Sequence, residues 1–223
     1  MTGHHGATVD VWYVRTGPST RRAASVLGAA ERARAQRLAS AADAARYVTA
    51  HVAAREVLAA RTGVAPGDVA WEVGPHGKPG AVVGQRWNLS RSGDHALVAL
   101  ATTDVGVDVQ VTDARVDVAA LARRFWKTGA DGDEQEQWRR VARLEACAKA
   151  VGGRLLDVLG LDVRDPGPVR ATDGAWRGQE WWVSDLPGPD GAVAACATPG
   201  PTPHTWRAHT WPAPDDAPPR RTA

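Results

Sequence analysis

Residues 87–111, WNLSRSGDHALVALATTDVGVDVQV, contain the clearest secondary-structure signals in the chain. Ala96–Leu100 is an apolar run bounded by turn-forming residues, which is typical of a buried strand. Val105–Val111 alternates valine with other residues, which is the period of a strand with one buried face. Side chains two residues apart leave a strand on the same side, so Asp108 and Gln110 share one face and the valines the other. The segment therefore predicts two neighbouring strands, one of them half-buried.

Upstream of this segment the sequence predicts a strand, helices and a loop. Val9–Val14 is short and mostly apolar, as expected for an extended opening. Ala29–Ala60 is rich in Ala and Arg and contains no Gly or Pro, so it predicts one or two helices. Ala70–Gly84 is rich in Gly and Pro and predicts a loop.

Downstream the pattern becomes helical and then irregular. Asp117–Trp126 and Asp133–Leu159 have helical spacing, and Asp133 is suited to cap the second helix. Gly191–Ala197 is the clearest of several short strands expected near the end. Seven prolines occur from residue 199 onward, so we expect an extended or disordered tail there.

The composition is that of a folded, water-soluble protein. Of 223 residues, 43% are apolar and 23% are charged, and no apolar run approaches the ~18 residues that cross a bilayer. The first residues lack the pattern of a secretory signal peptide, and two cysteines, Cys147 and Cys196, are too few for a disulfide framework. We therefore expect a protein of the reducing cytoplasm with no membrane partner, and we expect it to be a monomer.

The distribution of charge is more informative than its sum. A net charge of +2 argues against a nucleic-acid partner, because domains that bind nucleic acid usually carry a strong basic excess. Arginine nevertheless gathers between positions 21 and 61, where eight arginines occur with three acidic residues. This segment could attract a phosphate-bearing ligand or an acidic protein, or it could be a solvated helix face.

Two pairs of residues are candidates for chemistry. Asp108 and Gln110 share a strand face, and Glu145 and Lys149, four residues apart, share a helix face. Carboxylate and amide oxygens, without imidazole or thiolate, favour a hard cation such as Mg²⁺. Alternatively, Glu145 and Lys149 form an ordinary surface pair, and Asp108 is an exposed carboxylate of a strand.

Four short blocks of the sequence form a larger pattern. In chain order they are Gly77-Lys78-Pro79, Trp87-Asn88-Leu89-Ser90-Arg91-Ser92, Gly106-Val107-Asp108-Val109-Gln110 and Leu144-Glu145-Ala146-Cys147-Ala148-Lys149. Their order and spacing resemble the signature blocks of the Sfp-type 4′-phosphopantetheinyl transferase superfamily. With the helical segment that contains Asp43, Arg46 and Arg55, the resemblance covers about residues 30–155.

The resemblance implies an α+β fold made of two similar halves related by a pseudo-twofold axis. The N-terminal half would comprise residues 1–105 and the C-terminal half residues 106–198, followed by a Pro-rich tail at 199–223. Coenzyme A would bind in the cleft between the halves.

The resemblance also implies an activity. Members of this superfamily transfer the 4′-phosphopantetheine group of coenzyme A to a serine of an acyl or peptidyl carrier protein and release 3′,5′-ADP, with Mg²⁺ holding the pyrophosphate. Carried over residue by residue, Asp108, Gln110 and Glu145 would hold the metal. Glu145 would take the serine proton as general base, and Lys149 would stabilise charge on the phosphate.

The coenzyme A contacts are carried over in the same way. The residues implied are Arg46, Lys78, Pro79, Ser90 and Arg91. Arginine suits this task because its planar fork binds phosphate through two hydrogen bonds.

The chain departs from the usual blocks at several positions. Gln110 stands where the superfamily usually has a third acid, and Arg91 stands in place of a histidine. Val141 and Leu144 replace a tryptophan and a lysine, and the neighbouring Arg143 could supply the phosphate contact that the lysine would make. These departures leave a degenerate or repurposed coenzyme A-binding relative as an alternative, and a nucleic-acid- or protein-binding module as another. They also leave open the carrier, whether of fatty acid synthesis or of polyketide or peptide secondary metabolism.

Overall fold

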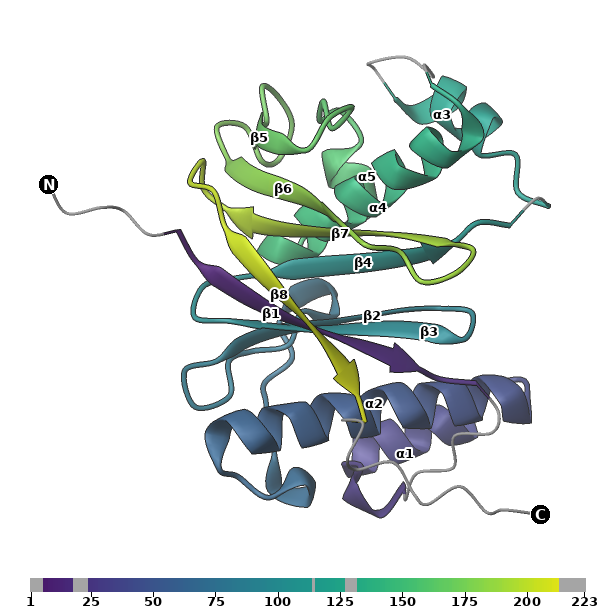
Figure 1. The fold of residues 1–223 in the computed structure, drawn as a ribbon, viewed down its shortest axis with the longest axis vertical. Coiled ribbons are helices and arrows are strands. Elements are labelled where there is room, and N and C mark those ends of the chain that lie inside the picture. Colours follow the sequence, from purple (N-terminus) through teal and green to yellow (C-terminus); the bar gives the residue numbers. More distant parts are fainter. Residues whose placement is uncertain (1–5, 18–23, 114, 127–131, 213–223) are drawn as a thin grey trace, which may run out of the picture.

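Two four-stranded sheets lie face to face, with helices on the outer face of each (Figure 1). The computed structural model describes residues 6–17, 24–113, 115–126 and 132–212. The first sheet has the order β2-β3-β1-β8, with β1 at Thr8–Arg15, β2 at Arg86–Ser92, β3 at His95–Ala101 and β8 at Thr205–Trp211. The second has the order β4-β7-β6-β5, with β4 at Gly106–Val111, β5 at Gly167–Arg170, β6 at Glu180–Leu186 and β7 at Ala192–Pro199. The predicted α+β class is confirmed.

Helix α2 (Ala41–Thr62) covers the outer face of the first sheet, and α1 (Ala29–Gln36) packs against α2. The predicted helical segment is thus two helices, and Ser40 separates them because its hydroxyl caps α2 by accepting the Asp43 N–H at 3.0 Å. Three single turns of 3₁₀ helix lie nearby, η1 (Ala24–Val26), η2 (Pro66–Asp68) and η3 (Pro75–Gly77).

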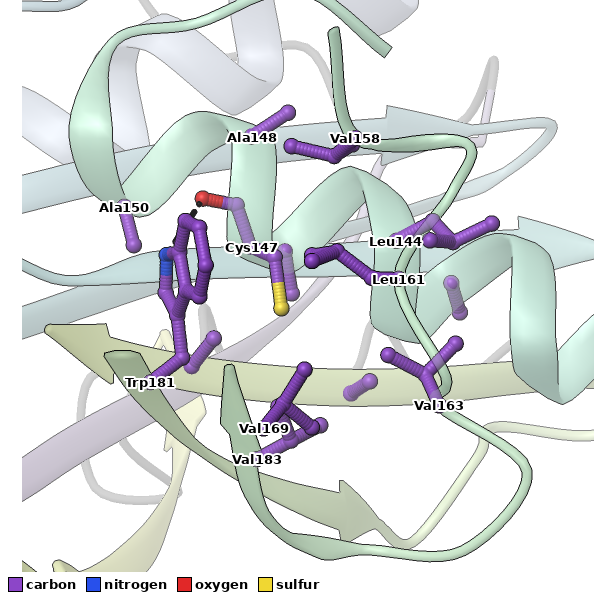
Figure 2. Packing of buried hydrophobic residues seen from close by; sticks show 14 of the residues in the cluster. Leu144, Cys147, Ala148, Ala150, Val158, Leu161, Val163, Val169, Trp181 and Val183 are labelled. Carbon is purple, nitrogen blue, oxygen red and sulfur yellow. Dashed lines mark hydrogen bonds between the residues drawn. The ribbon is translucent and has the colours of Figure 1, made fainter. Parts of the chain in front are cut away.

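Helix α4 (Glu134–Val151) covers the outer face of the second sheet, with α3 (Val118–Phe125) and α5 (Leu155–Val158) beside it. Figure 2 shows the packing, in which the Trp181 indole N–H donates to the Cys147 carbonyl at 3.1 Å. The sequence predicted one helix as far as Leu159. That prediction is wrong because Gly152 adopts a left-handed conformation, with φ of 71°, and ends α4.

The strand prediction for residues 105–111 is correct in period and wrong in exposure. Val107 and Val109 pack between the sheets, whereas Asp108 lies on the opposite face and is only 2% exposed. The cause is the close approach of α4. A Cβ atom on Gly106 would lie 2.0 Å from the Ala146 carbonyl oxygen, so only glycine permits this contact. Both faces of β4 are therefore covered.

The two sheets repeat one order of elements. In the first, β1 is followed by α2 and the antiparallel pair β2 and β3, and β3 pairs with β1. In the second, β4 is followed by α4 and, after β5, by the antiparallel pair β6 and β7, and β7 pairs with β4. The chain passes from the first sheet to the second between Ala101 and Gly106.

Strand β8 lies within the predicted extended or disordered tail, and the disordered alternative is wrong for residues 205–211. It lies parallel to β1, in register from Thr8 opposite Thr205 to Val14 opposite Trp211. Residues 204–211 contain no proline and can form a strand. The prediction failed here because it counted the prolines on either side of this stretch. The predicted tail at residues 213–223 lies outside the described residues.

Trp211 is the main apolar anchor of β8. Its side chain is buried in the core beneath the first sheet, and its indole N–H donates to Glu56 on α2 at 2.9 Å. We expect Trp211→Ala to lower the free energy of unfolding by about 3–5 kcal/mol, as large-to-small core substitutions do. The exposed Arg207 on the same strand is the control, and Arg207→Ala is expected to change it by less than about 0.5 kcal/mol. Urea unfolding of both variants measures the difference, and equal stabilities would contradict the packing of β8.

Candidate active site

The edge strands of the two sheets are joined by side chains. β4 and β2 each form one edge of their sheets, so one side of β4 has no neighbouring strand in its own sheet. The side chains of Asn88, Ser90 and Ser92 accept the N–H groups of residues 107, 109 and 111, at 3.0, 3.3 and 3.0 Å. Alternate residues of a strand face one way, which is why every second residue of β2 takes part. We call these three contacts the edge ladder.

The central contact of the edge ladder is also part of a charged cluster. The Ser90 hydroxyl donates to Asp108 Oδ1 at 2.6 Å. Lys149 Nζ, from α4, donates to the same oxygen at 2.5 Å and to Ser90 Oγ at 2.9 Å. The predicted residues Ser90, Asp108 and Lys149 therefore meet, from three different elements. Ser90 is buried and its hydroxyl binds protein groups, rather than facing a ligand as predicted.

Glu145 lies one helical turn before Lys149 and is half-buried. Burial raises the pKa of its carboxyl, Lys149 opposes that rise, and the nearby Asp108 carboxylate adds to it. Asp108 Oδ2 is buried and has no hydrogen-bond partner among the described residues. Two carboxyl groups, those of Asp108 and Glu145, thus lie close together, and Lys149 is the positively charged group beside both.

Gln110 follows Asp108 on the same face of β4 and is half-buried. Within the part of the chain that the structure describes, no three His, Cys, Asp or Glu side chains form a group able to hold a metal. Gln110 is an amide, so Asp108 and Glu145 are the two acidic members of the predicted metal-binding set.

A cavity of about 310 Å³ opens beside the cluster. It lies between the 74–80 loop and β2 on one side and the end of α4 on the other. Its lining comprises His51, Trp71, His76, Gly77, Lys78, Pro79, Trp87, Asn88, Leu89, Arg91, Lys149, Gly152 and Gly153. An adjoining cavity of about 670 Å³ shares Lys78 and Pro79 and adds acidic residues, among them Asp104 and Asp157. The predicted residues Lys78, Pro79, Arg91 and Lys149 therefore line one hollow.

Lys78 has a structural task that the sequence did not indicate. Its ammonium donates to the Lys149 carbonyl at 2.8 Å and to the Val105 carbonyl at 3.2 Å, and lies 3.8 Å from Asp104. Burial lowers the pKa of Lys78, and Asp104 opposes that shift. The side chain therefore caps the end of α4 and keeps one N–H donor for other use.

Two arginines lie elsewhere than the sequence suggested. Arg46, on α2, donates to Asp94 at 2.6 Å and Asp43 at 3.1 Å, and neither cavity is lined by it. Arg143 is 2% exposed and binds Asp185 through two hydrogen bonds of 2.7 Å. The expectation that Arg143 replaces the missing lysine at a phosphate is therefore wrong, because its guanidinium is buried in a structural network.

Sequence reasoning did not identify three cavity-lining residues as functional: His51, Trp71 and Trp87. Trp87 lies in the second of the four sequence blocks, but the pattern of that block gives it no role. His51 lies in the arginine-rich helix, where spacing alone does not single it out.

Comparison with known proteins gives one informative match. No family model matches the chain. The chain is 32% identical over 107 residues to a protein of Synechocystis sp. named "Putative 4'-phosphopantetheinyl transferase". The match covers 46% of this chain and 44% of that protein, so less than half of the relative's length is represented.

The resemblance to the 4′-phosphopantetheinyl transferases is confirmed. The likeness covers less than half of the chain. No helix in the described ranges is long and apolar enough to span a bilayer.

The edge ladder predicts unequal roles for two serines of this transferase-like chain. Ser90→Ala removes the acceptor of the Val109 N–H and a partner of Asp108, both buried, so we expect a loss of about 1–3 kcal/mol in unfolding free energy. Ser92→Ala removes one half-buried contact of the same kind, and we expect a loss below about 1 kcal/mol. Chemical denaturation compares them, and a Ser92→Ala loss as large as that of Ser90→Ala would contradict a special role for the central contact.

Proposed function

We propose that the protein transfers the 4′-phosphopantetheine group of coenzyme A to a serine hydroxyl of an acyl or peptidyl carrier protein and releases 3′,5′-ADP. The observation that carries this proposal is the Ser90, Asp108 and Lys149 cluster beside a cavity lined by basic side chains. The cluster is built from the blocks on which the resemblance rests.

The arrangement of the sheets supports a binding place for coenzyme A. The smaller cavity lies between elements of the first sheet's half and the end of α4 in the second. We propose that the halves, residues 1–105 and 106–198, are related by a pseudo-twofold axis and that coenzyme A lies between them. In this arrangement β8, from the end of the chain, completes the sheet of the first half.

The residues present suit a magnesium ion. Asp108 Oδ2 is buried without a hydrogen-bond partner in the described chain, and the Glu145 carboxyl is close enough for Asp108 to raise its pKa. A cation near both would relieve this repulsion, and carboxylate and amide oxygens are the donors that Mg²⁺ takes. We propose that Asp108, Glu145 and Gln110 hold it. When bound, the ion would neutralise charge on the diphosphate of coenzyme A.

The protein's own groups account for the remaining chemistry. Glu145 presents a half-buried carboxylate beside Asp108 and Lys149, and we propose that it takes the proton of the carrier serine. The serine oxygen then forms a bond to the phosphorus that carries pantetheine, and the bond from that phosphorus to the bridging oxygen breaks. The electron pair leaves with 3′,5′-ADP. Lys149 keeps one N–H donor beyond its two bonds and would donate it to a phosphate oxygen.

The proposal is tested by incubating the protein with Mg²⁺, coenzyme A and purified apo carrier proteins of fatty acid, polyketide and peptide synthesis. Intact-mass spectrometry should show one phosphopantetheine added to a carrier. Binding of coenzyme A without a mass increase on any carrier would favour the alternative, a coenzyme A-binding relative that does not transfer the group.

Removing the proposed base is expected to slow the reaction. Glu145→Gln keeps the shape of the side chain but cannot accept the serine proton, so we expect carrier labelling to slow by about 10²–10⁴-fold. Glu134→Gln, an exposed change on the same helix, is the control and should label at the normal rate. Initial rates are measured with saturating coenzyme A, after circular dichroism has shown that both variants are folded. A normal rate in Glu145→Gln would rule out its role as base.

Gln110 tests the metal assignment separately. An amide oxygen can coordinate Mg²⁺ but brings no charge, so Gln110→Glu should lower the Mg²⁺ concentration needed for half-maximal labelling. Gln110→Ala should reduce the rate by no more than about tenfold, since water can replace the amide. A Mg²⁺ titration of initial rates compares the three proteins. Loss of labelling in Gln110→Ala together with no gain in Gln110→Glu would place Gln110 at the substrate instead.

A further inference from the structure

His51 lies at the wall of the 310 Å³ cavity and belongs to none of the sequence blocks. It lies on α2, which packs on the outer face of the first sheet. The same cavity is lined by Arg91 from β2 and Lys149 from α4. An imidazole therefore shares a hollow with two permanent cations.

A buried carboxylate holds the His51 ring in one orientation. His51 Nδ1 lies 2.9 Å from Glu31 Oε1, and Arg55 binds Glu31 Oε2 through contacts of 2.7 and 2.8 Å. Burial would raise the pKa of Glu31, but the hydrogen bonds from His51 and the Gly28 N–H, with the charge of Arg55, hold it below its usual value. Glu31 is thus ionised and can only accept, so Nδ1 of His51 carries the hydrogen. The remaining nitrogen, Nε2, is the one left to accept a proton or to contact a ligand.

Tyr47 links His51 to Arg91. The rings of Tyr47 and His51 stack with centroids 4.0 Å apart, and the Arg91 guanidinium lies 5.0 Å from the Tyr47 centroid. Glu31 holds His51 by a hydrogen bond, the His51 ring stacks on Tyr47, and the Tyr47 ring packs against the Arg91 guanidinium. The contacts therefore connect a buried carboxylate on α1 to two residues of the cavity wall, His51 and Arg91.

The lining determines which part of a ligand fits there. Among the described residues, the cavity is lined by five basic side chains and by no Asp or Glu. The adjoining cavity has Glu72, Asp104 and Asp157 in its lining. A phosphate group is therefore favoured in the smaller cavity, where several cations and histidines can neutralise it.

The geometry points to His51 as a residue that binds a phosphate group of coenzyme A, with Nδ1 hydrogen-bonded to Glu31 and Nε2 donating to the phosphate once protonated. The inference rests on the proposed function. Because Nδ1 already donates to Glu31, Nε2 can donate only when the ring carries a second proton, so a lower pH favours this contact. The titratable and charged groups around the ring and the cavity are Glu31, Tyr47, Arg55, His76, Lys78, Arg91 and Lys149.

The test is calorimetric binding of coenzyme A and 3′-dephospho-coenzyme A at about pH 6.5 and about pH 8.5. His51→Phe keeps the ring stacked on Tyr47 and removes both nitrogens. We expect it to weaken coenzyme A by about tenfold or more at the lower pH, as for a charge-assisted hydrogen bond, and by much less at the higher. The ionisation of the ligand cancels because every protein meets the same ligand at the same pH.

Two further variants make the test specific. His51→Gln retains a donor for Glu31 but does not titrate, so the difference from the unchanged protein should again appear mainly at the lower pH. His95→Phe alters a histidine on β3 that lines a different cavity, and it should bind both ligands normally. Near-normal affinity of His51→Phe for both ligands at the higher pH would show that this variant is folded.

The outcomes separate the two proposals. A loss for coenzyme A alone assigns His51 to the 3′-phosphate, and a loss for both ligands assigns it to the diphosphate. Unchanged affinities in His51→Phe and His51→Gln at both pH values would overturn the inference and leave the transferase proposal intact. Failure of the unchanged protein to bind coenzyme A would overturn the proposed function, and this inference with it, without any variant being needed.

Discussion

The edge ladder between β2 and β4 is the contact on which the site depends. An edge strand leaves a row of backbone N–H groups that must find partners, and here the partners are side chains of the other sheet. The ladder fixes the register between the two sheets to a single residue, since a shift by one would turn Asn88, Ser90 and Ser92 away. With the register fixed, Ser90 lies opposite Asp108. The Ser90 hydroxyl is therefore part of both the edge ladder and the charged cluster.

The second constraint is the close approach of α4 to β4. Gly106 allows the helix to pass near the strand, as the short distance from a hypothetical Cβ to the Ala146 carbonyl shows. The ammonium of Lys149, from the last turn of α4, can then reach a carboxylate that is otherwise out of solvent. A buried carboxyl group is costly unless it has a partner, and the approach of the helix gives Asp108 that partner in Lys149.

The sequence predicted much of the fold because local patterns report local structure. The runs at residues 96–100 and 105–111 are strands β3 and β4, and the helices α1 and α2 occur where glycine and proline are absent. What failed depends on neighbours that a pattern does not contain. The period of β4 cannot show that α4 covers its second face, and the composition of the tail cannot show that β1 offers β8 a free edge. For the site, the blocks located Asp108, Glu145 and Lys149. The burial of Arg143 and the placing of His51 at a cavity follow only from packing.

The use of lysine at the end of α4 follows from the same geometry. The chain has three lysines, at positions 78, 127 and 149; of these, residue 127 lies outside the described part, and the other two meet at the last turn of α4. Lys78 donates to the backbone carbonyl of Lys149, and the ammonium of Lys149 pairs with Asp108. Each ammonium donates hydrogen bonds to two oxygen atoms that lie in different directions from it. An ammonium can do so because its three donors spread from one atom, whereas the guanidinium of arginine sends its donors out in a plane. A chain that otherwise prefers arginine therefore keeps lysine where compact, many-sided donation is required.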